Sequence, residues 1–133
     1  MWIPRLPALF IHYNNGMEGI SNYEKEIRPW GNFERFTLNE KSTVKIITVN
    51  PGQELSLQQH AHRDEEWLIL QGAGTVTVGE QKTEVKPGDN FFVARGTKHR
   101  VLGGPKGVMF LEIAFGDFDE ADITRLEDRY GRA

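Results

Sequence analysis

From residue 33 onward, short runs of alternating apolar and polar residues are separated by Gly, Pro and Asn. The alternation is clearest over residues 43–49 and again over residues 75–78. A period of two is typical of a β-strand whose two faces meet different surroundings. Turn signals such as Asn50-Pro51-Gly52 and Lys86-Pro87-Gly88-Asp89 close the runs. The pattern therefore predicts an all-β chain.

About nine strands are predicted, at residues 33–38, 43–49, 55–62, 67–70, 75–78, 81–85, 90–93, 99–102 and 108–115. Short strands joined by regularly spaced turns favour an antiparallel sandwich or barrel. The pattern changes after residue 117, because residues 119–127 begin with an acidic turn. Acidic residues favour a helix N-terminus, so this tail predicts one short C-terminal helix.

The length of 133 residues allows one sizeable core. We expect a single domain over residues 26–133 with its helical tail, preceded by an N-terminal arm over residues 1–25. The apolar start contains Pro4, Arg5 and Pro7, which does not fit a signal peptide. It is interpreted as a loosely packed tail, with a dimer-swapped arm or a membrane anchor as alternatives. No apolar run approaches ~20 residues, which favours a cytoplasmic protein.

Net charge and cysteine content limit the partners and the metal ligands that the chain can use. Sixteen basic and nineteen acidic residues give a formal net charge of −3. Such a weak field favours neither nucleic acid nor an anionic membrane as a partner. Cysteine is absent, so any metal site must use His, carboxylate or amide ligands.

Residues 58–67, Gln-Gln-His-Ala-His-Arg-Asp-Glu-Glu-Trp, carry the main candidate chemistry. On a strand, Gln58, His60 and His62 would point to one face. Carboxylates follow directly, and a further histidine, His99, comes after a second glycine-punctuated strand pair. Converging imidazoles and a carboxylate are typical of a divalent metal site. The stretch therefore predicts a metal centre and, with it, an enzyme.

Two spaced patterns extend this prediction. The first runs Gly52-x7-His60-x-His62-x2-Glu65-x6-Gly72, and the second runs Gly88-x5-Ala94-x-Gly96-x2-His99. Together they resemble the two motifs of the cupin superfamily, although Ala94 stands where proline is usual and the first motif is one residue shorter than the common form. The resemblance implies a cupin double-stranded β-helix, a jelly-roll barrel. It also implies a metal held by His60, His62, Glu65 and His99.

The choice of Glu65 over Glu66 rests on spacing and parity. Six residues separate Glu65 from Gly72, as in the cupin motif, and Glu65 shares a strand face with Trp67. Gln58 is a further candidate, as a metal ligand, a partner of the ligands or an ordinary barrel residue. If Gln58 completes the metal shell, His62 is free to move protons near neutral pH.

A narrower resemblance comes from five ordered motifs over about residues 26–132: Arg28-Pro-Trp-Gly31, Leu55-Ser-Leu-Gln58, His60–Trp67, Lys98-His-Arg100 and Glu127-Asp-Arg-Tyr-Gly-Arg132. They resemble the C-terminal cupin of type II mannose-6-phosphate isomerases, proteins of carbohydrate metabolism and polysaccharide biosynthesis. In that family the cupin often follows a mannose-1-phosphate guanylyltransferase domain. The sequence carries no glycine-rich nucleotide loop, so guanylyltransferase activity is not expected of these residues.

This resemblance implies a metal-dependent isomerase that interconverts mannose 6-phosphate and fructose 6-phosphate or a related sugar phosphate. Zn is the first choice of metal, with Mn, Fe, Co or Ni as alternatives. His62 is the candidate proton carrier, and Arg63, Lys98 and Arg100 are candidates for phosphate binding. A homodimer is expected, because exposed sheet edges favour pairing. A non-catalytic sugar-binding or regulatory cupin and a metal-dependent oxygenase are the alternative functions.

Overall fold

The computed structural model describes residues 11–13 and 19–133, and these contain ten strands and no helix. The chain divides into two compact units, Met1–Glu40 and Lys41–Ala133. The division falls after residue 40, whereas the sequence placed the start of the cupin domain at residue 26. Residues 1–10 and 14–18 of the predicted arm lie outside the described residues. The described residues include no helix that could span a membrane.

The first unit is a three-stranded antiparallel sheet in the order β1-β2-β3. Its strands are β1 (Ile11–Tyr13), β2 (Glu24–Arg28) and β3 (Gly31–Arg35). The β2–β3 register ends with Arg28 opposite Gly31, so two residues, Pro29 and Trp30, make the turn. Proline presets the turn, and Gly31 has a φ of +142°, a value that glycine adopts readily.

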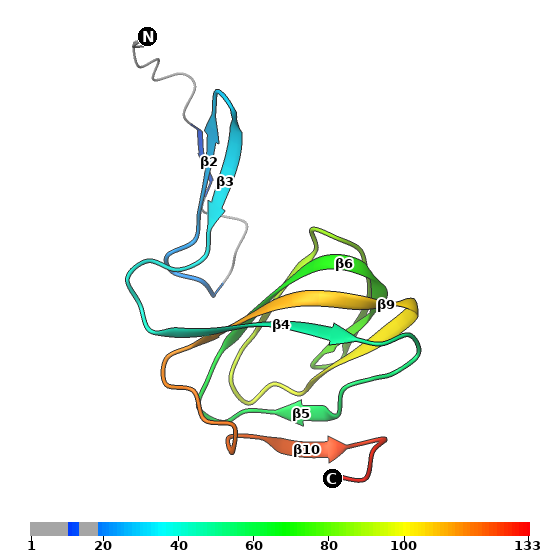
Figure 1. The fold of residues 1–133 in the computed structure, drawn as a ribbon. Coiled ribbons are helices and arrows are strands. Elements are labelled where there is room, and N and C mark those ends of the chain that lie inside the picture. Colours follow the sequence, from blue (N-terminus) through cyan, green and yellow to red (C-terminus); the bar gives the residue numbers. More distant parts are fainter. Residues whose placement is uncertain (1–10, 14–18) are drawn as a thin grey trace. The chain divides into compact units, whose positions relative to one another are not determined.

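The second unit is a seven-stranded antiparallel sheet that curls into a barrel (Figure 1). Its main path is β10-β5-β9-β6-β7, while β4 pairs with β9 and β8 pairs with β6. The strands are β4 (Ser42–Val49), β5 (Leu57–Gln59), β6 (Glu65–Val78), β7 (Gln81–Val85), β8 (Asn90–Val93), β9 (His99–Phe115) and β10 (Thr124–Glu127). The sequence prediction of an all-β chain is confirmed.

Two long strands form the centre of this barrel, and each joins two strands that the sequence predicts separately. β6 covers predicted residues 67–70 and 75–78, and its pairing with β9 shifts register around Gly72. Gly72 has a φ of +84°, and a Cβ on it would lie 2.2 Å from the carbonyl oxygen of Gly107. Glycine is therefore required where the two strands bend past each other.

The inner faces of these strands make the core. Trp67, Val101 and Phe110 are fully buried, and the rings of Trp67 and Phe110 lie 5.0 Å apart. Trp67 also contacts His99 edge-on at 5.3 Å. A large apolar wall therefore holds the polar residues at one end of the barrel in place.

The predicted C-terminal helix over residues 119–127 does not form. Residues 124–127 are strand β10, which pairs with β5 (Figure 1). The acidic turn is present, because the Asp119 carboxylate accepts the Ala121 N–H at 2.9 Å. A nine-residue helix is marginal by itself, and the free edge of β5 offers backbone hydrogen bonds instead. Tertiary pairing overrides the local helix signal here.

Candidate metal centre

Three buried side chains, His60, Glu65 and His99, converge at the end of the barrel where β5 ends and where β6 and β9 begin. One ligand atom from each lies within 4.8 Å of the others. The two histidine Nε2 atoms are 3.2 Å apart. The Glu65 carboxylate lies 3.5 Å from the His60 Nε2 and 3.9 Å from the His99 Nε2. The structure thus brings together three of the four residues that the cupin resemblance implies.

Backbone carbonyls set the protonation of both imidazoles. The Nδ1 atom of His60 lies 2.7 Å from the Asp122 carbonyl oxygen, and that of His99 lies 2.9 Å from the Thr97 carbonyl oxygen. A carbonyl only accepts, so each Nδ1 carries the proton, and in the neutral ring each Nε2 presents a lone pair. Burial lowers the pKa of His99, which favours that neutral form.

This donor set fits a divalent metal ion. Bonds of about 2.0–2.1 Å to nitrogen and oxygen place two ligand atoms of one tetrahedral site roughly 3.3 Å apart. Two of the three observed separations, 3.2 and 3.5 Å, are close to that value, and the third, from His99 to Glu65, is longer at 3.9 Å. Without a shared ion, two lone pairs would face each other beside a buried carboxylate. Imidazoles and a carboxylate suit zinc and several other divalent ions.

A buried arginine, Arg63, contacts two of the three groups. Its Nε donates to Glu65 at 2.9 Å, and one NH2 group lies 3.2 Å from the His60 Nε2. The other donates to the Asp119 carbonyl at 3.2 Å, and the guanidinium lies 4.5 Å from the Phe118 ring centre. Arg63, predicted as a phosphate contact, therefore pairs with the ligand groups themselves.

Three further residues, Trp67, Glu112 and Asp122, have contacts or charges in this region that the sequence reasoning did not predict. Trp67 donates its indole N–H to Glu65 at 3.2 Å. Asp122 accepts the backbone N–H groups of Ala61 and His62 at 2.8 and 3.0 Å.

Glu112 lies opposite Trp67 on the inner face, and burial together with the Glu65 charge raises the pKa of Glu112 to about 7. The sequence held a signal for Glu112, since it is the one acidic residue within the apolar run 108–115.

The two other candidate ligands occupy different positions. His62 is exposed and does not join the cluster. The reason is that β5 ends at Gln59, so strand alternation does not continue to His62. Gln58 lies directly opposite His99 and so shares its face. The Gln58 Oε1 accepts the Ser56 hydroxyl at 3.0 Å.

Lys98 and Arg100, the remaining phosphate candidates, flank His99 and lie away from the cluster. Lys98 pairs with Glu80 at 2.6 Å, and Arg100 pairs with Glu127 at 3.1 Å. Both line a groove of about 260 Å³ together with Glu54, Leu57, Thr75, Thr77, Gly79, Glu80, Lys82, Leu102 and Glu127. Their carboxylate partners already satisfy much of their charge.

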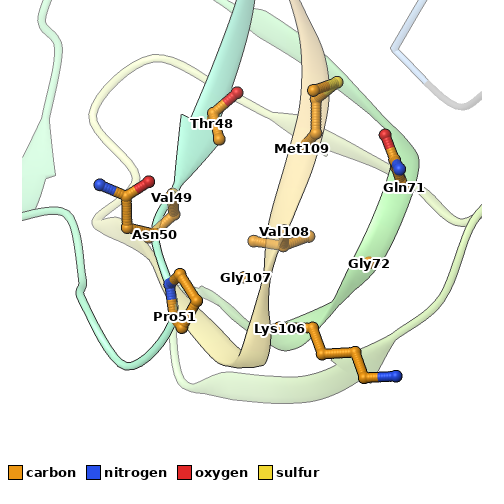
Figure 2. Close-up of a pocket in the computed structure, with 10 residues that line it drawn as sticks. All are labelled: Thr48, Val49, Asn50, Pro51, Gln71, Gly72, Lys106, Gly107, Val108 and Met109. Carbon is orange, nitrogen blue, oxygen red and sulfur yellow. The ribbon is translucent and has the colours of Figure 1, made fainter.

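A pocket of about 420 Å³ lies at the other end of β4, and Figure 2 shows its lining residues: Thr48, Val49, Asn50, Pro51, Gln71, Gly72, Lys106, Gly107, Val108 and Met109. Its one charged side chain, Lys106, extends away from Thr48 and Asn50 in Figure 2. None of the three clustered residues lines it. The pocket is separate from the candidate metal centre.

Comparison with known families identifies the chain. The family described as Mannose-6-phosphate isomerase C-terminal matches residues 15–128. The chain belongs to this family. It is 37% identical over 112 residues to the xanthan biosynthesis protein XanB of Xanthomonas campestris, covering 83% of this chain and 24% of XanB. It is 35% identical over 107 residues to the mannose-1-phosphate guanylyltransferase ManC of Salmonella typhimurium, covering 79% of this chain and 22% of ManC. The chain thus spans about a quarter of the length of these relatives.

Solved structures agree on the fold. A Klebsiella pneumoniae protein with a double-stranded β-helix domain superposes with a TM-score of 0.57 at 24% identity, covering 71% of this chain and 84% of that protein. At this identity the likeness concerns the fold alone. The predicted cupin double-stranded β-helix is confirmed, and so is the family resemblance.

The predicted activity is wrong. The relatives that carry this domain include a guanylyltransferase of mannose 1-phosphate, and what the comparisons support is the cupin fold, without isomerase activity. The motifs identified the fold and a ligand set, but related sites on one fold serve different reactions. In addition, Lys98 and Arg100, expected to bind the phosphate of the isomerase substrate, pair with carboxylates elsewhere.

Proposed function

We propose that this chain is a divalent-metal-binding cupin module that acts in the synthesis of polysaccharide precursors from mannose phosphates. The observation that carries the proposal is the buried group of His60, Glu65 and His99, whose ligand atoms lie within 4.8 Å of one another. The names of the relatives, a xanthan biosynthesis protein and a mannose-1-phosphate guanylyltransferase, support the pathway.

The hydrogen bonds around the cluster support metal binding. The carbonyl groups of Asp122 and Thr97 orient the two imidazoles, and Trp67 and Arg63 orient the carboxylate. Such outer contacts fix the ring tautomer and the direction of each ligand. When bound, the metal would supply a Lewis acid at the buried end of the barrel. The ligand groups would hold it without large rearrangement.

Metal titration tests this proposal. Purified protein, stripped with a chelator, is titrated calorimetrically with Zn²⁺, Mn²⁺, Co²⁺, Ni²⁺ and Fe²⁺. We expect one site per chain, and we expect the His60→Ala/His99→Ala variant to lose at least about 100-fold in affinity, because two ligands are removed. His62→Ala is the matched control, since His62 is exposed outside the cluster.

Two outcomes contradict the proposal. One is unchanged metal affinity in the double variant, provided that circular dichroism shows native strand content. The other is the absence of one-to-one binding for every metal tested. If His62→Ala lowers the metal affinity as much as the double variant does, His62, the fourth predicted ligand, moves into the site when the metal binds.

A further inference from the structure

Arg125 differs from the other arginines that the structure describes. Its Nε is buried and has no hydrogen-bond partner, and its guanidinium forms no ion pair with any described residue. Each of the others pairs with a carboxylate: Arg28 with Glu26, Arg35 with Glu24, Arg63 with Glu65, Arg95 with Asp64, Arg100 with Glu127, Arg129 with Glu54 and Arg132 with Asp128. Arg125 is therefore the one described arginine that has no carboxylate partner among the described residues.

The sheet register places Arg125 in line with the candidate metal centre. Arg125 lies directly opposite Gln58 in the β10–β5 pair, and Gln58 lies directly opposite His99 in the β5–β9 pair. Residues directly opposite each other share a face, so all three belong to the face that carries the cluster. Two strand spacings separate Arg125 from His99, roughly 10 Å between Cα atoms. Its neighbour Leu126 points the other way and is exposed.

Gln58 lies between the two charged positions. Its carbonyl oxygen accepts from Ser56 at 3.0 Å, which leaves its NH2 group as a donor. Along this row the face therefore presents two donor groups, the guanidinium of Arg125 and the amide NH2 of Gln58, next to the imidazole of His99. No carboxylate lies in the row itself.

A partner for Arg125 is expected on energetic grounds. A buried N–H without a hydrogen bond destabilises the folded protein, and a charged donor does so more strongly. The planar guanidinium matches the two oxygens of a carboxylate or phosphate group. The other arginine of this face, Arg63, is already occupied by Glu65 and His60. An anionic ligand in the barrel would meet Arg125 as its available cation.

We propose that Arg125, assisted by the amide of Gln58, binds the oxyanion of a small ligand whose other end approaches the metal centre. The oxyanion is a phosphate monoester or a carboxylate, since both match the guanidinium. The inference rests on the proposed function, because it assigns the ligand class of the same barrel end. It adds a binding residue in β10 that neither the motifs nor the metal cluster contain.

Calorimetric titration of the metal-loaded full chain tests the inference. The probes are mannose 1-phosphate, glucuronate and neutral mannose, which separate a phosphate, a carboxylate and an uncharged sugar. We expect one of the two anions to bind at least tenfold more tightly than mannose. Arg125→Met should lower the affinity for that anion at least tenfold and leave mannose unchanged. Arg129→Met is the matched control, as this exposed arginine of the same tail pairs with Glu54.

The failures of the two proposals are distinguishable. Absence of metal binding overturns the proposed function. If metal binding is normal, two results overturn the Arg125 inference and leave the proposed function standing. Either no anion binds, or Arg125→Met binds the anion as tightly as the wild type does. Should Arg125→Met fail to fold, the side-chain Nε–H resonance of Arg125 in labelled wild-type protein decides. A shift on adding the anion supports the inference, and an unchanged resonance at 10 mM (about a weak-binding limit) overturns it.

Discussion

The inner and outer faces of strands β4, β6 and β9 give two neighbouring glutamates different surroundings. On the inner face, Glu65 has Arg63 and Trp67 as hydrogen-bond donors. On the outer face, Glu66 is equally buried, but neither of its carboxylate oxygens has a partner among the described residues. Burial therefore raises the pKa of Glu66 to about 8. Because the two carboxylates are equally buried, it is the convergent donors and imidazoles that distinguish Glu65 as the candidate ligand.

The same contrast extends across the sheet. Opposite Trp67 on the inner face lies Glu112, within reach of the Glu65 charge. On the outer face, Val44 and Ile46 of β4 are 56% and 62% exposed. The inner face thus gathers buried polar groups at one end of an apolar core, while part of the outer face leaves apolar side chains in solvent. Polar interiors carry chemistry at a cost in stability.

The largest expected effect comes from Glu65→Gln. The substitution removes the negative charge that faces the buried guanidinium of Arg63. Leaving a buried charge uncompensated costs about 3–5 kcal/mol, and the candidate metal centre loses its carboxylate. Urea unfolding measures the change in free energy of unfolding. A loss below about 1 kcal/mol would show that the inner face does not depend on this pair.

Arg63→Met should lower the free energy of unfolding of the metal-free protein by about 3 kcal/mol, because Glu65 then keeps only Trp67 as a hydrogen-bond donor. A divalent ion should restore much of that stability, since it replaces the missing positive charge. The measurement is the rise in Tm on adding metal, in the variant and in the wild type. We expect the larger rise in the variant. Equal rises would show that Arg63 and the metal do not share the ligand groups.

Glu66→Gln should raise the free energy of unfolding, and by less than the two substitutions above lower it. In the folded state the pKa of Glu66 is raised from 4.5 to about 8, so the folded protein binds the proton more tightly than the unfolded chain. The wild type therefore loses stability as the pH rises from about 4.5 to 8. The variant should be more stable by about 1–3 kcal/mol above pH 8 and equal to the wild type near pH 4. Unfolding curves across this range test the sign; a gain that does not change with pH would rule out the ionisation argument.

Alternation of apolar and polar residues in the sequence was sufficient to predict several strands and the residues on their inner face. It predicted the strands that became β4, β7 and β8, and parity with Trp67 separated Glu65 from Glu66. These results follow because a strand's two faces are encoded by neighbouring residues. The motif spacing also paired His60 with the distant His99, and the structure places their Nε2 atoms 3.2 Å apart.

Other features depend on contacts between segments far apart in the chain. His62 lies outside the cluster because β5 ends at Gln59, and the tail becomes β10 because it finds the free edge of β5. The activity expected from the motifs was wrong, since motifs describe a fold and its ligands more closely than a reaction.

By itself, then, the sequence determined the fold class, the family and the core of the candidate metal centre, because these depend on local periodicity and fixed spacing. Only the tertiary structure decided that Arg63 pairs with the candidate ligand groups and that Arg125, opposite Gln58, has no ion-pair partner among the described residues. Which cation meets which carboxylate depends on strand register and on where loops cross the barrel, and no local pattern encodes either.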